Sequence, residues 1–165
     1  MTDHEFAAFL PSRQRMSRAI ELAREARKAG DYAIGAVVTL HDKIIGESGN
    51  RVKLDSDPTC HAEMVAIRAA CRYTGKRHID GAVLYTTAEP CPMCASAAFW
   101  ARMAGVVSGS TIGDMTVFRS NFGSDDWSWR TIDITTKAVL EAVDPQLFHV
   151  SSFMRNECLE LFHRE

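Results

Sequence analysis

The sequence predicts an α/β protein, with helices on both faces of a mixed sheet of about five strands in a three-layer α/β/α sandwich. Segments with apolar residues at helical spacing alternate along the chain with short runs rich in β-branched residues. The first two such runs, 34–40 and 43–48, are close enough to form a hairpin, so the sheet contains an antiparallel pair. No internal repeat or linker interrupts the 165 residues, which predicts a single domain over 1–165.

Start and stop signals divide the chain into elements. Ser12 can cap a helix that runs to about Ala29, and Gly30 stops this helix. The segment 111–135 is predicted to be a loop with one short helical turn, because it is irregular and contains two glycines. The pattern predicts further helices at 60–73, 91–103, 136–143 and 152–163, and further strands at 82–87, 105–110 and 147–151.

Composition and charge limit the possible functions. The 19 Lys and Arg against 21 Asp and Glu give a net charge of −2, whereas a protein dedicated to polyanions usually has a basic excess. Nucleic acid is therefore disfavoured as the main partner. The chain has no apolar run that suits a signal peptide or a transmembrane segment, and its five cysteines do not suit a secreted disulfide framework. We expect a cytoplasmic protein without a membrane partner.

Two short stretches carry residues of chemical interest at predicted helix starts. DSDPTCHAEMVAIRAAC (55–71) places His61 and Glu63 two residues apart, which is about 200° around a helix axis, so these side chains can converge only beyond the helix N-terminus. TTAEPCPMC (86–94) places Cys91 and Cys94 three apart, where the helix dipole favours their thiolate forms.

One imidazole and two thiolates form a ligand set that suits Zn²⁺. Three protein ligands, His61, Cys91 and Cys94, leave the fourth tetrahedral position open, which is typical of a catalytic zinc site. Glu63 is not needed as a ligand and can serve as the catalytic acid and base, because it can take a proton from an activated water and deliver it to a leaving group.

The motifs HAE (61–63) and PCPMC (90–94) match the H-x-E…P-C-x-x-C signature of zinc nucleobase deaminases. On these residues the chain resembles the cytidine and deoxycytidylate deaminase superfamily, and the order of its elements is similar to the cytidine deaminase-like fold over most of its length. The resemblance implies an aminohydrolase that cleaves a C–N bond of a cyclic amidine and releases ammonia. It also implies that His61, Cys91 and Cys94 bind the zinc ion and that Glu63 shuttles protons.

Longer stretches indicate the kind of substrate. SDPTCHAEMVAIRAAC (56–71) and LYTTAEPCPMCASAAFWAR (84–102) resemble the guanine deaminase branch, which acts on a nucleobase in purine metabolism. The alternatives are a tRNA adenosine deaminase and a cytosine deaminase. The tRNA enzymes generally carry a basic C-terminal helix, whereas this chain ends in NECLELFHRE (156–165), with three acidic residues and one arginine. With one arginine against three acidic residues, the ending lacks the counterion release that favours tRNA binding.

The chain also departs from the guanine deaminase branch. Ala33 and Ile34 occupy the places where that branch usually has proline and phenylalanine, and Cys60 replaces an alanine. The segment 111–135 resembles none of the three branches, and we expect it to cover the pocket. These departures leave other guanine-like rings open as substrates, such as another aminopurine, a pterin or an aminotriazine.

Four residues are candidates for substrate contact. Asn50 falls where the family has a substrate-binding asparagine, and its amide offers a donor and an acceptor; the alternative is an ordinary turn asparagine. The backbone N–H of Ala62 is available at a helix N-terminus. Trp127 and Trp129 can stack on a flat ring, or they can anchor the core or an interface. Glu89 is expected to be stabilised by a helix dipole rather than to take part in catalysis.

Partners other than the substrate are less well indicated. A homodimer is expected because the family commonly forms dimers, and the apolar helix that ends in SAAFWARM (96–103) suits a partner. Arginines on the first helix could offer tRNA a basic surface, but glutamates on the same helix favour a mixed solvated face; these are Arg13, Arg15, Arg18, Arg24, Glu21 and Glu25. Outside the enzyme class, the alternative is a non-catalytic binding protein stabilised by zinc. In that case Cys60, Cys71 or Cys158 closes the fourth position, although nothing would then require Glu63.

Overall fold

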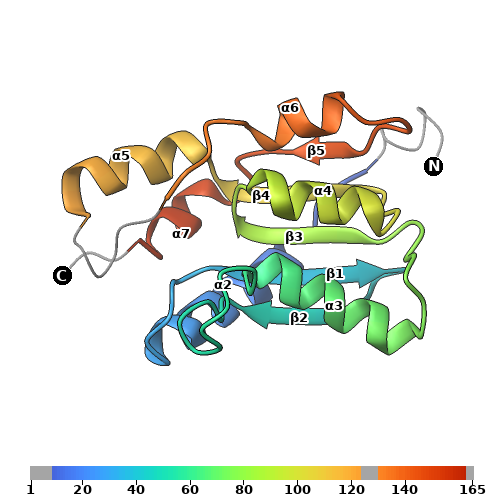
Figure 1. The fold of residues 1–165 in the computed structure, drawn as a ribbon, viewed down its shortest axis with the longest axis horizontal. Coiled ribbons are helices and arrows are strands. Elements are labelled where there is room, and N and C mark those ends of the chain that lie inside the picture. The colour runs from blue at the N-terminus through green and yellow to red at the C-terminus, as the bar shows by residue number, and fades with distance from the viewer. Residues whose placement is uncertain (1–8, 124–129, 163–165) are drawn as a thin grey trace.

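The structure, a computed structural model, describes residues 9–123 and 130–162 and is built on one five-stranded sheet (Figure 1). Along the sheet the strand order is β2-β1-β3-β4-β5. β1 pairs antiparallel with both β2 and β3, and β3, β4 and β5 run parallel to one another. The predicted mixed sheet of about five strands is therefore confirmed. The strands are β1 (Gly35–Leu40), β2 (Lys43–Gly49), β3 (Val83–Ala88), β4 (Gly105–Ser110) and β5 (Phe148–Val150).

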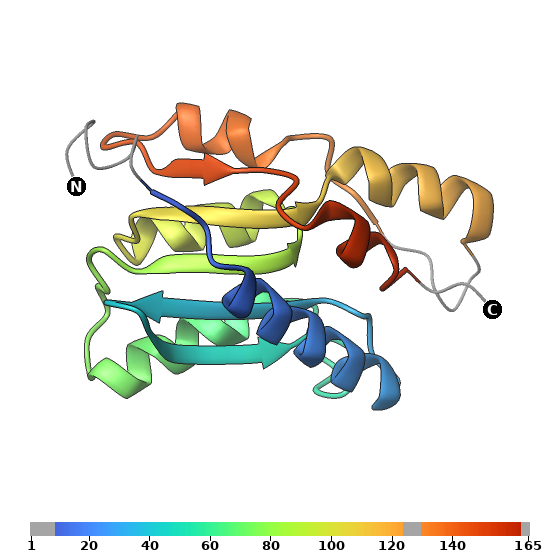
Figure 2. The ribbon, with the colours of Figure 1, turned by 180° about the vertical axis from the view of Figure 1, so that it is seen from behind.

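Helices cover both faces of the sheet, as the sequence predicts. α3, α4 and α6 lie on the face that is toward the viewer in Figure 1, and α2 and α7 lie on the opposite face, seen in Figure 2. α5 extends beyond one end of the sheet. The helices are α2 (Arg13–Lys28), α3 (Ala62–Thr74), α4 (Pro92–Trp100), α5 (Ile112–Phe122), α6 (Thr136–Glu141) and α7 (Arg155–Leu159).

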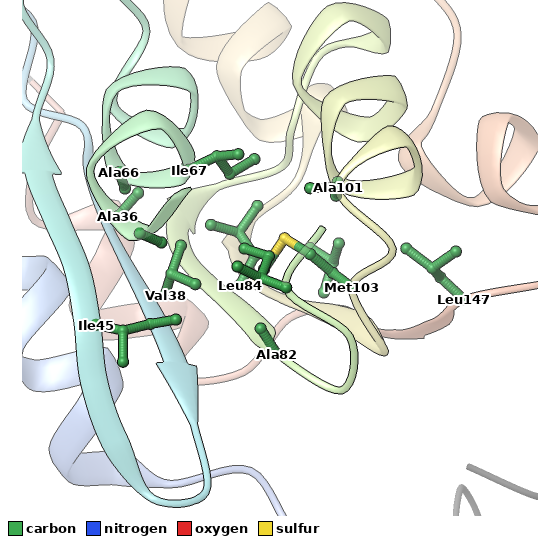
Figure 3. Packing of buried hydrophobic residues seen from close by; sticks show 14 of the residues in the cluster. Ala36, Val38, Ile45, Ala66, Ile67, Ala82, Leu84, Ala101, Met103 and Leu147 are labelled. Carbon is green, nitrogen blue, oxygen red and sulfur yellow. The ribbon is translucent and has the colours of Figure 1, made fainter. Parts of the chain in front are cut away.

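The two faces of the sheet have separate cores because successive residues of a strand point to opposite faces. In β3, Leu84 packs with Val38, Ile67 and Met103 under α3 and α4, as Figure 3 shows. Its neighbour Tyr85 packs in the second core, beneath α2 and α7. The central strands are therefore buried on both sides, and they hold the ends of the flanking helices in place.

Two glycines bring the flanking helices unusually close to the hairpin β1–β2. A Cβ atom at Gly35 would lie 2.0 Å from the carbonyl oxygen of Ala19 in α2. A Cβ atom at Gly46 would lie 2.4 Å from the carbonyl oxygen of Ala66 in α3. Only glycine permits these distances, so the sequence of the hairpin sets how deeply α2 and α3 lie against the sheet.

Several strand ends and two helix starts lie together at one edge of the sheet. The strand registers place the C-terminal ends of β2, β3 and β4 beside the N-terminal end of β1. Both α3 and α4 begin at this edge (Figure 1). In open α/β sheets the carboxyl ends of parallel strands are the usual place for a ligand, and helix N-termini there provide unpaired N–H groups.

The segment 111–135 differs most from its prediction, because residues 112–122 form the helix α5 instead of a loop. Thr111 and Asp114 close a capping box: the Thr111 hydroxyl accepts from the Asp114 N–H at 3.1 Å, and the Asp114 carboxylate accepts from the Thr111 N–H at 2.9 Å. Ile112, Met115 and Phe118 are buried. The loop prediction was wrong because capping and packing outweigh the weak helix propensity of this segment.

The C-terminal helix is also shorter than predicted. α7 spans five residues instead of 152–163. Ser152 and Met154 have φ angles of 62° and 53°, so the backbone is left-handed immediately before the helix and the helix cannot begin earlier. Similarly, α4 ends at Trp100 rather than near 103, since Arg102 has a φ of 57°. Within residues 9–123 and 130–162, no helix has the length and apolar character needed to cross a bilayer.

Candidate metal centre and its surroundings

His61, Cys91 and Cys94 come together at the shared edge of the sheet. His61 is the residue immediately before α3, Cys91 is the residue immediately before α4, and Cys94 lies in the first turn of α4. The Cys91 Sγ atom is 3.6 Å from His61 Nδ1 and 3.7 Å from Cys94 Sγ, and Cys94 Sγ is 3.6 Å from His61 Nδ1. Two helix starts that are 30 residues apart in the chain thus present three ligand atoms to one point.

These distances fit a tetrahedral zinc ion. Sulfurs at about 2.3 Å and a nitrogen at about 2.0 Å from such an ion would be about 3.7 Å (S–S) and about 3.5 Å (S–N) apart. The three measured distances agree with this triangle. The donor set of one imidazole and two sulfurs also matches the preference of zinc.

The electrostatics of the cluster favour ionised sulfur. The hydrogen bond between the sulfurs of Cys91 and Cys94, with the nearby imidazole of His61, lowers the pKa of Cys91 to about 4. The same hydrogen bond and burial raise the pKa of Cys94. The hydrogen bond with Cys91 raises the pKa of His61 against the effect of its burial. Cys91 is therefore the thiol that ionises first, as a metal ligand must.

Glu63 lies in the first turn of α3, two residues after His61, and its side chain is buried. Burial raises the pKa of Glu63, while the charge on His61 opposes this effect. A buried carboxyl with a raised pKa takes up a proton more readily than an exposed glutamate does. The arrangement at the helix start is therefore suited to proton transfer beside the three ligand atoms.

The other cysteines do not complete the metal site. Among the described residues, the metal-competent cluster consists of His61, Cys91 and Cys94. The Cys60 thiol is 3.4 Å from a carboxylate oxygen of Asp57 instead. The Cys71 thiol faces the carbonyl of Arg77, and Cys158 packs against β4 at Gly109. The alternative of a closed structural site with one of these sulfurs is contradicted by their positions.

Asn50 immediately follows β2, and its buried amide contacts Asp31, which precedes β1. The Asn50 Nδ2 group donates to the Asp31 carboxylate at 2.7 Å. The next residue, Arg51, donates its N–H to the carbonyl of Cys60 at 3.0 Å, and Cys60 is the residue before His61. Asn50 is therefore more than a turn asparagine, since tertiary contacts hold it at the edge where α3 begins. Sequence reasoning missed Asp31, because nothing local marks an aspartate after a helix-terminating glycine.

Glu89 is buried and joins two helix starts. One carboxylate oxygen accepts from the N–H of Ile112, the first residue of α5, and the other accepts from the N–H of Thr136, the first residue of α6, both at 2.9 Å. The expected stabilisation by a helix N-terminus is thus supported, although the helices are α5 and α6 rather than α4. Ala62 is the first residue of α3, so its N–H lies outside the intrahelical hydrogen-bond pattern. Trp127 and Trp129 fall outside the described residues.

Comparison with known proteins identifies the family. The profile described as the cytidine and deoxycytidylate deaminase zinc-binding region matches residues 11–110, well over half of the chain. The chain belongs to this family. The matched region runs from the start of α2 to the end of β4, and it includes both halves of the metal centre. α5, α6, β5 and α7 follow the matched region.

Relatives of this chain include deaminases with different substrates. The guanine deaminase of Bacillus subtilis (strain 168) is 47% identical over 88 residues, which are 53% of this chain and 56% of that protein. A tRNA-specific adenosine deaminase of Agrobacterium fabrum (strain C58 / ATCC 33970) is 42% identical over 95 residues, 58% of this chain and 62% of that protein. The chain thus covers less than two thirds of the length of either relative.

A solved structure gives a longer match. It comes from a study of A-to-I editing by tRNA:A34 deaminases at the wobble position of transfer RNA. It has a TM-score of 0.70 and 29% identity, and it covers 92% of this chain and 100% of that chain. The similarity includes the three-layer arrangement predicted from the sequence. Relatives that act on a free base and relatives that act on tRNA are therefore both similar to this chain.

Proposed function

We propose that this protein is a zinc-dependent hydrolytic deaminase of a small aminated heterocycle, guanine or a guanine-like base, and that it releases ammonia. The observation that carries the proposal is the buried Glu63 beside three ligand atoms with the spacing of a tetrahedral zinc site. A structural zinc site requires four protein ligands and no buried acid, whereas a hydrolytic site requires an open position and a proton carrier.

Each residue of the centre has a separate task. His61, Cys91 and Cys94 hold the metal ion at the ends of α3 and α4. A zinc ion held there would supply Lewis acidity and so activate a water molecule. The Glu63 carboxylate takes up a proton from the attacking water and delivers it to the amino group, which leaves as ammonia. Burial raises the pKa of Glu63, which favours uptake of this proton. The Asn50 amide and the Ala62 N–H bind and orient the ring.

The charge distribution on α2 supports a small base over tRNA. Arg18 forms ion pairs with Glu21, Glu25 and Glu47. Arg13 pairs with Glu157 of α7, and Arg15 pairs with Asp42. Arginines that are neutralised in this way contribute little to phosphate binding, because an incoming phosphate must compete with a carboxylate already in place.

A tRNA adenosine deaminase is the second candidate. The similarity to tRNA-specific adenosine deaminases, in sequence over 95 residues and in structure over 92% of the chain, favours it. The catalytic chemistry proposed for Glu63 is the same for both candidates. Only the substrate distinguishes them, so the decisive experiment compares substrates.

The test measures ammonia release by zinc-loaded protein from guanine, guanosine, cytosine, cytidine, adenine, pterins, aminotriazines and an anticodon stem-loop that contains adenosine. We expect turnover of guanine or a close analogue. We also expect Cys91→Ala to lose stoichiometric zinc, as measured by atomic absorption. Turnover of the RNA alone would assign the protein to the tRNA candidate. Silence on every substrate with zinc bound would favour a non-catalytic binding protein.

We also propose that the protein forms a homodimer through α4. The Trp100 side chain at the end of α4 is 72% exposed, and its ring lies 5.1 Å from that of the partly buried Phe99. An exposed tryptophan that packs on a partly buried phenylalanine is typical of an interface anchor. Light scattering after gel filtration should give twice the chain mass of 18.3 kDa. The variant Trp100→Glu should lower the measured mass toward that of the monomer.

A further inference from the structure

Asp31 is a fully buried carboxylate, 0% exposed, that accepts four hydrogen bonds. Three come from the backbone N–H groups of Tyr32 at 2.8 Å, Lys53 at 2.8 Å and Leu54 at 3.0 Å. The fourth comes from the Asn50 side chain at 2.7 Å. Burial disfavours the charge on Asp31, but these donors outweigh burial and lower its pKa, so the group is an anion at neutral pH.

An ionised carboxylate has no proton to donate. This fixes which end of the Asn50 amide faces Asp31. The group of Asn50 that faces Asp31 must be its NH₂, since two oxygens would repel each other. The carbonyl oxygen Oδ1 therefore occupies the other branch of the amide. In the described parts of the chain no donor bonds to this oxygen, although the residue is only 2% exposed. A buried acceptor without a donor points to a ligand that supplies one.

The position of Asn50 makes the substrate the natural ligand. Its own N–H donates to the Ile34 carbonyl at 2.8 Å, which fixes its backbone at the start of β1. The hydrogen bond from Arg51 to the carbonyl of Cys60 ties the following residue to the segment that begins α3. The amide of Asn50 and the metal ligand His61 are thus held at the same edge of the sheet by backbone contacts on both sides.

We infer that Asp31 is a positioning residue that turns the carbonyl oxygen of Asn50 toward the substrate, so that this position selects a heterocycle with an N–H donor on the facing edge. The inference rests on the proposed function and deepens it. Guanine and related lactams carry a ring N–H and an amino group on one edge. Adenine has no ring N–H on its six-membered ring. The fixed Asn50 carbonyl oxygen therefore favours lactam bases over adenine. A ring nitrogen of adenine would place its lone pair against this oxygen, so that two acceptors would face each other.

The variant Asp31→Asn tests the inference because it should invert Asn50. The N–H groups of Lys53 and Leu54 both bond to Oδ2 of residue 31 and require an oxygen there. The new NH₂ group therefore replaces Oδ1, the atom that faces Asn50 and the N–H of Tyr32. The Asn50 amide then turns its oxygen toward residue 31 and presents NH₂ to the substrate. We expect kcat/KM for the accepted base to fall about 10- to 100-fold in Asp31→Asn, with zinc content unchanged.

A double-mutant cycle separates positioning from simple structural support. In the background Asn50→Ala, Asp31→Asn should change kcat/KM by less than about 2-fold, because the residue through which it acts is absent. In the double variant that combines Asp31→Asn with Asn50→Asp, the NH₂ group of residue 31 donates to a carboxylate at position 50. That carboxylate still offers an oxygen to the substrate, so kcat/KM should partly return. Asp55→Asn is the matched control. It alters a carboxylate of the same segment that bonds to Arg51 rather than to Asn50, and it should leave kcat/KM unchanged.

The inference would be overturned if Asp31→Asn lowered kcat/KM by the same factor in the presence and in the absence of the Asn50 side chain. Wild-type kcat/KM in Asp31→Asn would also overturn it. If the wild type deaminates no base, the proposed function fails, and calorimetric titration of the zinc-loaded variants with guanine decides the role of Asp31. The inference is supported if Asp31→Asn weakens guanine binding when Asn50 is present but not in the Asn50→Ala background. Absence of guanine binding in the wild type overturns it, because no lactam then reaches Asn50.

Discussion

Two carboxyl groups buried in this protein, Glu63 at the start of α3 and Asp31 before β1, have opposite properties. Burial raises the pKa of Glu63. Burial also disfavours the charged form of Asp31, but four hydrogen-bond donors reverse the effect and lower its pKa. The difference indicates that fixed donors can outweigh burial and hold a buried acid as an anion, whereas burial dominates where donors contribute less.

Glu63→Gln tests the proton-carrier side of this comparison and has the largest expected effect. The amide has the same shape but cannot carry a proton, so the rate of ammonia release should fall about 10²- to 10⁴-fold. Zinc content should remain that of the wild type, since Glu63 is not one of the three clustered ligands. A loss of less than about 10-fold would show that Glu63 is not the proton carrier.

Asp31→Ala tests the role of the hydrogen-bonded anion by measuring protein stability. The change removes the acceptor of four hydrogen bonds and leaves the Asn50 amide and three backbone N–H groups without it. We expect the free energy of unfolding to fall by about 2–4 kcal/mol, as measured by urea denaturation. Glu63→Gln should show no comparable loss in the same experiment. Equal stability losses in the two variants would contradict the distinction between the two acids.

The pH dependence of stability provides a smaller test of Asp31. Because its folded pKa is below the ordinary value of 3.8, its ionised form stabilises the folded state above that pH. This contribution is lost as the pH falls below 3.8 toward the folded pKa. The wild type should therefore be more stable than Asp31→Asn at about pH 6, and the difference in urea midpoint should narrow at about pH 3. A constant difference would mean that Asp31 is not held as an anion.

Glu89 offers an intermediate case, with two fixed donors instead of four. In Glu89→Gln one carboxylate oxygen becomes an NH₂ group, which opposes the N–H of either α5 or α6. We expect a loss of about 1–2 kcal/mol in the free energy of unfolding, with zinc content unchanged. A loss equal to that of Asp31→Ala would show that the loss of stability does not follow the number of hydrogen bonds that the carboxylate accepts.

The metal centre was predictable because its information is local. His61 and Glu63 are two residues apart and Cys91 and Cys94 are three apart, each pair at a predicted helix start, and together the pairs match the signature of zinc nucleobase deaminases. The strands β1 to β4 were also predicted closely, since β-branched runs and the short turn at 41–42 define them. Both the motifs and these strands lie within residues 11–110, the region that matches the deaminase family.

α5 was missed although one local signal was present. Thr111 and Asp114 form the T-x-x-D pattern of a capping box, which marks a helix start even where propensity is weak. Gly113 and the β-branched residues of the segment concealed it. The buried face of α5 became apparent only in the fold, where Phe118 packs against Phe162 from the far end of the chain with ring centroids 5.0 Å apart.

By itself, the sequence determined the layered α/β arrangement, the three candidate ligands and the acid beside them. The alternation of helical and strand patterns indicates the layers, and two short motifs at helix starts carry the ligands and the acid. Only the tertiary structure decided which polar groups support that centre. Asp31 meets Asn50 across 19 residues, and Glu89 meets Thr136 across 47. Contacts at such separations depend on how the strands order themselves in the sheet, and no local pattern of residues encodes that order.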